Sequence, residues 1–163
     1  MAGFTTNGGS SWSRAKFPSR TQYLEALWCL SSSRCVAVGN AGTCTSGACQ
    51  YSGPGVVDAT TDAGVSWSSV PIPAHVTGLN ALSCPTPSRC IALGSNGQEG
   101  AAIYTSNGGI SWSEQASTTW RTLGYMSGIA CPSTNTCVAV GDGGGTQTPI
   151  AFTINGGASW QKA

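Results

Sequence analysis

The chain has 163 residues, a length typical of a single domain, and only 8% of its residues carry a charge. Its net charge of +1 comes from seven basic and six acidic residues that are scattered along the sequence. Without a basic patch for phosphates, nucleic-acid binding is not expected, and no apolar run is long enough to insert into a membrane.

A nine-residue pattern, which we call the box, occurs four times and begins at Phe4-Thr-Thr-Asn-Gly-Gly-Ser-Ser-Trp12. Its shared core is Thr-x-Asn/Asp-x-Gly-x-Ser-Trp, and the final tryptophans are 55, 45 and 48 residues apart. A repeat of this length, without sustained helical periodicity, predicts four-stranded propeller blades. The defining box residues are Asn7, Gly9, Trp12, Asp62, Gly64, Trp67, Asn107, Gly109, Trp112, Asn155, Gly157 and Trp160.

In chain order, residues 1–22 have room for only the outer strands of a blade and are expected to form a partial one. Three longer units follow at about 23–69, 70–114 and 115–163, each opening with short apolar runs between turn residues, as buried strands do. The middle unit predicts strands at about 79–84, 90–94, 101–105 and 110–114. We therefore expect an all-β protein in which residues 1–163 form one propeller or partial-propeller domain of about three and a half blades of four antiparallel strands.

Eight cysteines fall into four local pairs, three of which share the spacing C-x5-C between the first and second strands of a unit. Pairing within a hairpin keeps the Cα atoms close enough for a disulfide. Zinc is disfavoured because His75 is the only histidine and the three repeated pairs should lie in separate blades. We predict disulfides, an oxidising compartment and no metal or other cofactor. The bridges are Cys29–Cys35, Cys44–Cys49, Cys84–Cys90 and Cys131–Cys137.

The box resembles the Asp-box, or BNR, repeat of sialidase-like β-propellers, Ser/Thr-x-Asp-x-Gly-x-Thr/Ser-Trp, and the resemblance covers nearly the whole chain. The C-x5-C pair followed by Ala-Val-Gly is similar to secreted bacterial BNR-like propellers, which implies an extracellular location. The first residues lack the features of a signal peptide, so a mature end, an engineered cut or a partial chain is expected. In the family the boxes lie away from the active site, and three carry Asn here, which weakens any role in cation binding.

Sialidases of this family use an arginine triad, but Arg34 and Arg89 occupy equivalent hairpin positions where the third unit has Thr136, as repeated structural residues would. Glu99 and Asp142 fall in corresponding loops and are the carboxylate pair that could share one face. We therefore expect a non-catalytic module. The alternatives are part of an Asp-box glycoside hydrolase and a purely structural assembly protein.

The loops that differ between units should share the face opposite the boxes, and variable loops on a rigid scaffold usually carry binding. Trp120 stands among polar residues and is expected to be an exposed indole suited to sugar or peptide contact. Local packing is the competing interpretation for Trp120 and for Trp28. We predict that a glycan or protein binds at Trp120, Arg121, Tyr51, His75, Glu99 and Asp142. Because propellers close with four to eight blades, we also expect copies of the chain, or missing sequence, to complete the ring.

Overall fold

The computed structural model describes residues 2–45, 48–50, 53–97, 99–115, 120, 124–142 and 150–163, with the backbone alone for residues 21, 22, 43–45 and 48–50. Within this part the chain is all-β, and three antiparallel sheets have four strands each. The predicted fold of four-stranded propeller blades is confirmed. No helix in the described ranges is long and apolar enough to cross a lipid bilayer.

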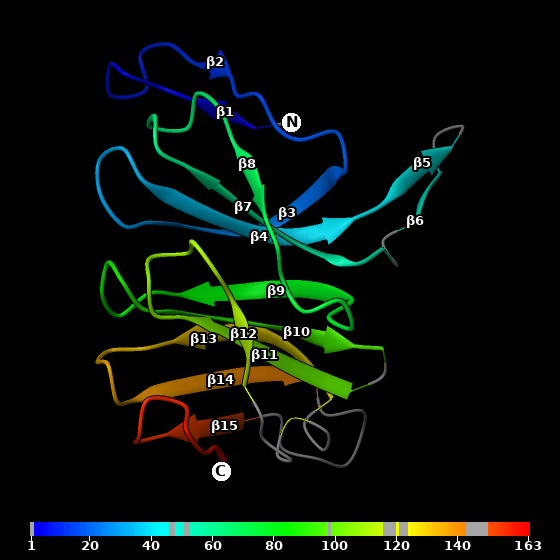
Figure 1. Cartoon of the computed structure of the whole chain (residues 1–163), viewed down its shortest axis with the longest axis vertical. Coiled ribbons are helices and arrows are strands. Elements are labelled where there is room, and N and C mark those ends of the chain that lie inside the picture. Colours follow the sequence, from blue (N-terminus) through cyan, green and yellow to red (C-terminus); the bar gives the residue numbers. More distant parts are fainter. Residues whose placement is uncertain are drawn as a thin grey trace.

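Each sheet follows chain order as a meander, and the sheets stack along the long axis of the molecule (Figure 1). The half blade is β1 (Gly3–Phe4) and β2 (Ser13–Arg14). The first blade is β3 (Thr21–Cys29), β4 (Cys35–Ala41), β7 (Gly55–Thr60) and β8 (Ser68–Val70). The second is β9 (Gly78–Ser83), β10 (Cys90–Asn96), β11 (Glu99–Thr105) and β12 (Ser113–Glu114). The third is β13 (Tyr125–Ala130), β14 (Cys137–Asp142), β15 (Ile150–Thr153) and β16 (Gln161–Lys162).

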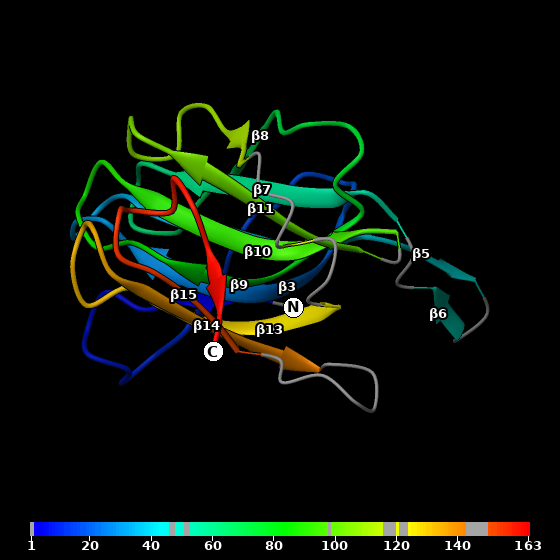
Figure 2. The same ribbon diagram turned by 90° about the horizontal axis from the view of Figure 1, so that it is seen from below.

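An additional hairpin extends the first blade beyond the stack. It consists of β5 (Thr43–Thr45) and β6 (Ala48–Gln50), which pair with each other and project away from the sheets (Figure 1). The inner strands β3, β9 and β13 are neighbours, since β9 contacts both of the others, and Figure 2 shows the stack from the side of the third blade.

Apolar side chains between successive sheets form the core in two layers. Val36 and Val38 of β4 face the second blade and pack with Leu79 and Ile103. The second layer repeats this arrangement between the second and third blades, with members that include Ile91, Leu93, Met126 and Ala139. In the second blade the short apolar runs therefore fold as strands that are covered on both faces by neighbouring sheets.

The glycine that ends each Ala-Val-Gly-like run is required by a close approach of two strands. At Gly94 a Cβ atom would lie 1.7 Å from the carbonyl oxygen of Gly78, and the β9–β10 register shifts between Leu93 and Gly94. Gly39 and Gly141 meet the neighbouring inner strand in the same way. Glycine permits this bulge because it has no side chain to displace the inner strand.

Three of the predicted disulfides are confirmed, with Cα–Cα distances of 3.9 to 4.0 Å. They are Cys29–Cys35, Cys84–Cys90 and Cys131–Cys137. Each closes the hairpin between the first two strands of a blade. For the fourth pair the backbone register places Cys44 opposite Cys49, but these side chains lie outside the description, and the bridge stays a prediction.

Candidate functional site

The four box turns share one network of hydrogen bonds, illustrated by the third box. The Thr105 hydroxyl donates to Oδ1 of Asn107 at 2.8 Å and accepts from the amide of Gly109 at 3.1 Å, while the amide of Ser111 donates to Asn107 Oδ1 at 3.1 Å. Equivalent bonds close the other boxes. The defining polar residues of the box are thus occupied within their own turn.

The only carboxylate among the box residues is that of Asp62, and its turn stabilises the charged form. The hydroxyl and amide of Ser66 and the hydroxyl of Thr60 all donate to it. These hydrogen bonds, led by that from the Ser66 hydroxyl, lower the pKa of Asp62 from 3.8 to about 2. Within the described residues, no group of three or more His, Cys, Asp or Glu side chains could hold a metal ion.

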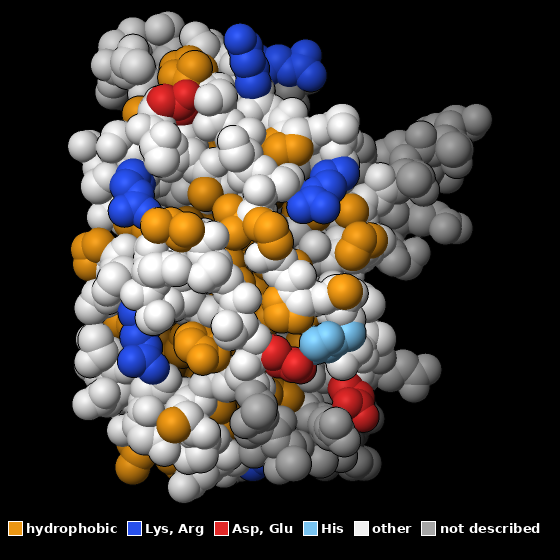
Figure 3. All heavy atoms as spheres, viewed as in Figure 1, with side chains coloured by type: hydrophobic (Ala, Val, Ile, Leu, Met, Phe, Trp, Pro, Cys, Tyr) orange, Lys and Arg blue, Asp and Glu red, His pale blue; other side chains and the backbone are white. Residues whose placement is uncertain are grey.

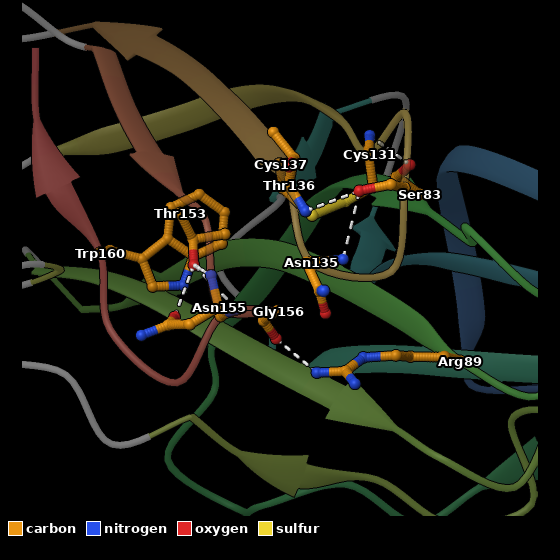
Figure 4. The surroundings of a disulfide bond; sticks show 12 residues. Ser83, Arg89, Cys131, Asn135, Thr136, Cys137, Thr153, Asn155, Gly156 and Trp160 are labelled. Atoms are coloured by element: carbon orange, nitrogen blue, oxygen red, sulfur yellow. Dashed lines mark hydrogen bonds between the residues drawn. A yellow bond between two sulfur atoms is a disulfide. The ribbon is translucent and has the colours of Figure 1, made fainter.

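The boxes and the disulfide hairpins lie at the same end of the blades and are joined there (Figure 4). Within the third blade the amide of Gly156 donates to the carbonyl of Asn135 at 2.7 Å. Across blades, the guanidinium of Arg89 donates to the carbonyl of Gly156, as that of Arg34 does to Gly108 at 3.1 Å. We call this the interblade arginine contact. It gives both arginines a structural role between blades.

At the opposite end of the blades, polar side chains line a cavity of about 480 Å³, which we call the polar cavity. It lies where the three inner strands meet, and it is lined by Glu25, Asn40, Thr77, Gly78, Asn80, Ser95, Gly97 and Tyr125. Each full blade contributes at least one of these residues. Its position at the ends of β4 and β10 places it beside the loops that differ between blades.

Amide and hydroxyl groups tie the wall of the polar cavity together. Asn40 Oδ1 accepts from the amide of Leu79 at 3.0 Å, and Asn80 Nδ2 donates to the carbonyl of Met126 at 3.3 Å. The Thr77 hydroxyl donates to the carbonyl of Ser95 at 3.2 Å. The first two bonds link neighbouring blades and the third lies within the second blade, so the wall is held in place before any ligand arrives.

Glu25 and Tyr125 supply the exposed polar groups of the cavity. Both side chains are more than one-third exposed, and among the described residues neither makes a hydrogen bond or an ion pair. A carboxylate accepts hydrogen bonds, and a phenol both donates and accepts while offering an apolar ring. These two groups on opposite blades can therefore contact a polar ligand without breaking an existing bond.

The expectation of an exposed indole at Trp120 is wrong. The side chain is only 2% exposed, and its ring packs against that of Trp160 with centroids 4.7 Å apart. It belongs to the core layer between the second and third blades, together with Met126. The polar sequence around Trp120 did not predict this burial, because the space that holds the ring is formed together with a neighbouring blade. Trp28, in contrast, is partly exposed.

The other predicted binding residues are dispersed or lie outside the description. His75 Nε2 lies 2.8 Å from a carboxylate oxygen of Glu114, with both side chains partly exposed. Glu99 begins β11 and Asp142 ends β14, both at the loop end of the blades and both exposed. None of these three lines the polar cavity. Tyr51 and Arg121 fall among the residues that are not described.

Sequence reasoning missed the polar cavity, although the repeat contained a signal for it. Glu25, Asn80 and Ser127 occupy the same position of the inner strand, each between two apolar or small residues. A polar residue at this point in successive units indicates a polar channel lined by the inner strands. Because successive side chains of a strand point to opposite faces, residues at this equivalent position are expected to lie on the same side of each inner strand.

Stacked four-stranded meanders with their inner strands side by side define the chain as a β-propeller protein. No protein-family model matches the chain, and no curated protein matches it in sequence. Similar solved structures include "YCF48 bound to D1 peptide", with a TM-score of 0.67 and 15% identity over 90% of this chain and 42% of that one. An ancestral GH74 enzyme has a TM-score of 0.66 and 18% identity over 97% of this chain and 20% of its own.

A third similar structure is the GH74 xyloglucanase from Xanthomonas campestris, with a TM-score of 0.62 and 11% identity over 85% of this chain and 23% of that one. At these identities the likeness shows the propeller fold alone. The chain spans from 20% to 42% of the length of these three structures.

Proposed function

We propose that this chain is a secreted, non-catalytic propeller module of the Asp-box type that binds a glycan at the polar cavity. The observation that supports it most directly is the pair of exposed side chains, Glu25 and Tyr125, which have no hydrogen-bond or ion-pair partner among the described residues and lie on a preformed polar wall. The shared hydrogen bonds of the four box turns support the Asp-box assignment. The three disulfides support export to an oxidising compartment.

A glycan suits this cavity because a sugar presents hydroxyl groups and apolar C–H faces together. The hydroxyls can donate to Glu25 and exchange hydrogen bonds with Asn80, and a sugar face can lie against the ring of Tyr125. The protein is weakly charged, with 8% charged residues, and the face of the outer strands shown in Figure 3 carries only isolated Lys, Arg, Asp and Glu side chains. A neutral polyhydroxylated ligand suits a protein that produces no strong field.

Glycan-array binding by the intact chain tests this proposal. Glu25→Gln keeps the shape of the side chain but removes its charge, and Tyr125→Phe removes only the hydroxyl. We expect each to weaken binding roughly tenfold, which corresponds to one strong hydrogen bond. Glu99→Gln and Asp142→Asn are matched controls outside the cavity and should bind as the unchanged chain does. Loss of binding in the controls, with Glu25→Gln unaffected, would move the site to the variable loops.

A second candidate ligand is a peptide segment, favoured by the similar structure of YCF48 bound to D1 peptide. Backbone amides could use the same Glu25 and Tyr125. Binding of an unstructured peptide library by the intact chain, with no glycan retained on the array, would favour this candidate. Sensitivity to the same two substitutions would place the peptide in the polar cavity.

Part of a glycoside hydrolase is the third candidate, since the similar structures include GH74 enzymes. Glycoside hydrolysis commonly uses two carboxylates flanking the scissile bond, and Glu25 is the single carboxylate among the described lining residues of the polar cavity. This composition supports binding over hydrolysis. Turnover of a fluorogenic glycoside that disappears in Glu25→Gln would overturn the non-catalytic assignment.

We also propose that copies of the chain associate through the uncovered face of the third blade. A purely structural assembly protein would use this association alone and would need no ligand. Val138, Val140 and Ile150 are 41%, 45% and 39% exposed. Their counterparts in the second blade are Ile91, Leu93 and Ala102, which are at most 1% exposed because the next blade covers them. An equivalent covering by a second copy would remove this apolar patch from water.

A further inference from the structure

One hydrogen-bond donor of the polar cavity belongs to a buried side chain and has no partner. Asn40, on β4, is only 7% exposed, and its Oδ1 accepts the hydrogen bond from the amide of Leu79. This bond identifies Nδ2 as the other end of the side-chain amide, and Nδ2 has no hydrogen-bond partner among the described residues. A donor on a side chain this deeply buried is expected to have an acceptor, and in a cavity a ligand can supply it.

A matching acceptor lines the same cavity from the inner strand of the second blade. Asn80 directly follows Leu79, and its Nδ2 donates to the carbonyl of Met126 in the third blade. Its Oδ1 therefore stays available and has no partner among the described residues. Each asparagine is thus oriented by one bond to the main chain of the next blade, and both lie between blades that have all four strands.

We propose that the polar cavity selects sugars that carry an acetamido group, the N-acetylhexosamines, an inference that rests on the glycan binding proposed above. The acetamido carbonyl accepts from Nδ2 of Asn40 and its N–H donates to Oδ1 of Asn80, because these two groups of a trans amide point in opposite directions. The acetamido methyl group packs against the ring of Tyr125. A hydroxyl at the same sugar carbon offers a single atom for both bonds and no methyl group.

The charge of the polar cavity favours neutral sugars of this class over acidic ones. Glu25 is the single carboxylate among its described lining residues, and no lysine or arginine is among them. A ligand carboxylate would therefore meet a like charge without a compensating cation. Neutral N-acetylhexosamine oligomers avoid this repulsion, and their hydroxyls can still donate to Glu25.

Calorimetric titration of the intact chain with chitotetraose and cellotetraose tests the selectivity. The two oligomers share their linkage and differ only at the second carbon of each sugar, which carries an acetamido group in the first and a hydroxyl in the second. We expect chitotetraose to bind at least about tenfold more tightly, as two additional hydrogen bonds require. This comparison needs no variant of the protein, so it stands whether or not a cavity variant folds.

Asn40→Asp is the matching protein variant. It keeps an oxygen for the amide of Leu79 but replaces the donor by an acceptor, and it should remove most of the preference for chitotetraose. Asn96→Asp is the control, since it makes the same exchange on β10 at a residue that does not line the cavity, and it should keep the preference. Circular dichroism and thermal melting verify the folding of both variants.

The outcomes separate this inference from the glycan binding on which it rests. Equal affinity for both oligomers, each weakened by Glu25→Gln, would overturn the acetamido selectivity and leave glycan binding in place. A preference that survives Asn40→Asp would overturn the role of the asparagine pair. No heat of binding with either oligomer at about 10 mM, together with an empty glycan array, would refute the glycan proposal itself. Peptide binding that is lost in Asn40→Asp would then assign the pair to a peptide amide and overturn the sugar.

Discussion

The guanidinium of Arg34 donates a hydrogen bond of 3.1 Å to the carbonyl of Gly108, and so joins the disulfide hairpin of the first blade to the box of the second. Arg89 and Gly156 repeat this relationship one blade later. A guanidinium is charged at every accessible pH and can serve as a permanent donor to a carbonyl that the box turn leaves unpaired. The hairpin and the box, the two repeated motifs of the sequence, are therefore coupled between blades as well as within them.

Removing this contact should destabilise the chain. We expect Arg34→Ala to lower the free energy of unfolding by about 1 kcal/mol, because a partly exposed hydrogen bond from a charged donor is lost. Denaturation in urea measures the change. Arg14→Ala is the control, since Arg14 is exposed on β2 and its side chain has no hydrogen bond or ion pair among the described residues. A loss in Arg14→Ala as large as that in Arg34→Ala would contradict the structural role.

Asp62 should make acid stability depend on the second box. Its folded-state pKa of about 2 is below the ordinary value of 3.8, so folding favours the ionised form. The resulting stabilisation is complete above about pH 4 and is lost as the pH falls through the folded pKa near 2. We expect the stability difference between the unchanged chain and Asp62→Asn to shrink over this window. Urea denaturation at pH 5 and pH 2 measures it, and a carboxyl titration by NMR with a midpoint near 3.8 would contradict the assignment.

Ala63 should be a point of backbone strain. It has φ of 59°, whereas the equivalent positions in the other boxes are Gly8, Gly108 and Gly156. Ala63→Gly relieves the left-handed strain but makes the unfolded chain more flexible, and we expect a net stabilisation of about 0.5 kcal/mol.

The reciprocal change, Gly108→Ala, should destabilise by about 2 kcal/mol, because the added Cβ is strained and also meets the Arg34 guanidinium and the carbonyl of Pro87. Thermal unfolding of both variants measures the two effects. Equal and opposite shifts in melting temperature would show that backbone strain alone acts and that the arginine contributes nothing.

The repeat made the fold predictable, because boxes and paired cysteines mark the same turns in every unit. The tertiary contacts of individual side chains were less accessible. Trp120 follows a polar segment, yet it is buried against Trp160, a residue 40 positions away, in a space that only the stacking of two blades creates. The importance of Glu25 was hidden for the converse reason. The inner strand β3 becomes part of a cavity only when the inner strands of the other two blades lie beside it.

For the arginines, comparison of the repeats did help to predict a tertiary contact. Arg34 and Arg89 align with Thr136 in the sequence, which predicts a repeated structural contact, and both arginines make such a contact with the next blade. The carbonyl that accepts each of these hydrogen bonds, however, lies on the next blade, and the sequence around the arginine does not identify it. The pattern therefore identified the residues, and the stacking of the sheets identified their function.

Thr136 also provides a gain-of-function test of the proposed association of copies through the third blade. If the uncovered face with Val138 and Val140 packs against the half blade of a second copy, residue 136 lies opposite the first box, as Arg89 lies opposite the fourth. That box has Gly8, where a Cβ would meet no atom within 4 Å, so an arginine can approach. Thr136→Arg should then tighten association roughly fivefold by adding one interblade arginine contact.

Sedimentation velocity over a range of protein concentrations measures this association, and Val138→Asp is the opposing variant, expected to abolish it by placing a charge in the apolar face. The double variant Thr136→Arg with Gly8→Ala should lose most of the gain, because the added methyl group would crowd the guanidinium, as a Cβ at the equivalent Gly108 would crowd Arg34. A compact monomer at all concentrations for the unchanged chain and for Thr136→Arg would refute self-association. A gain that survives Gly8→Ala would place the second copy elsewhere.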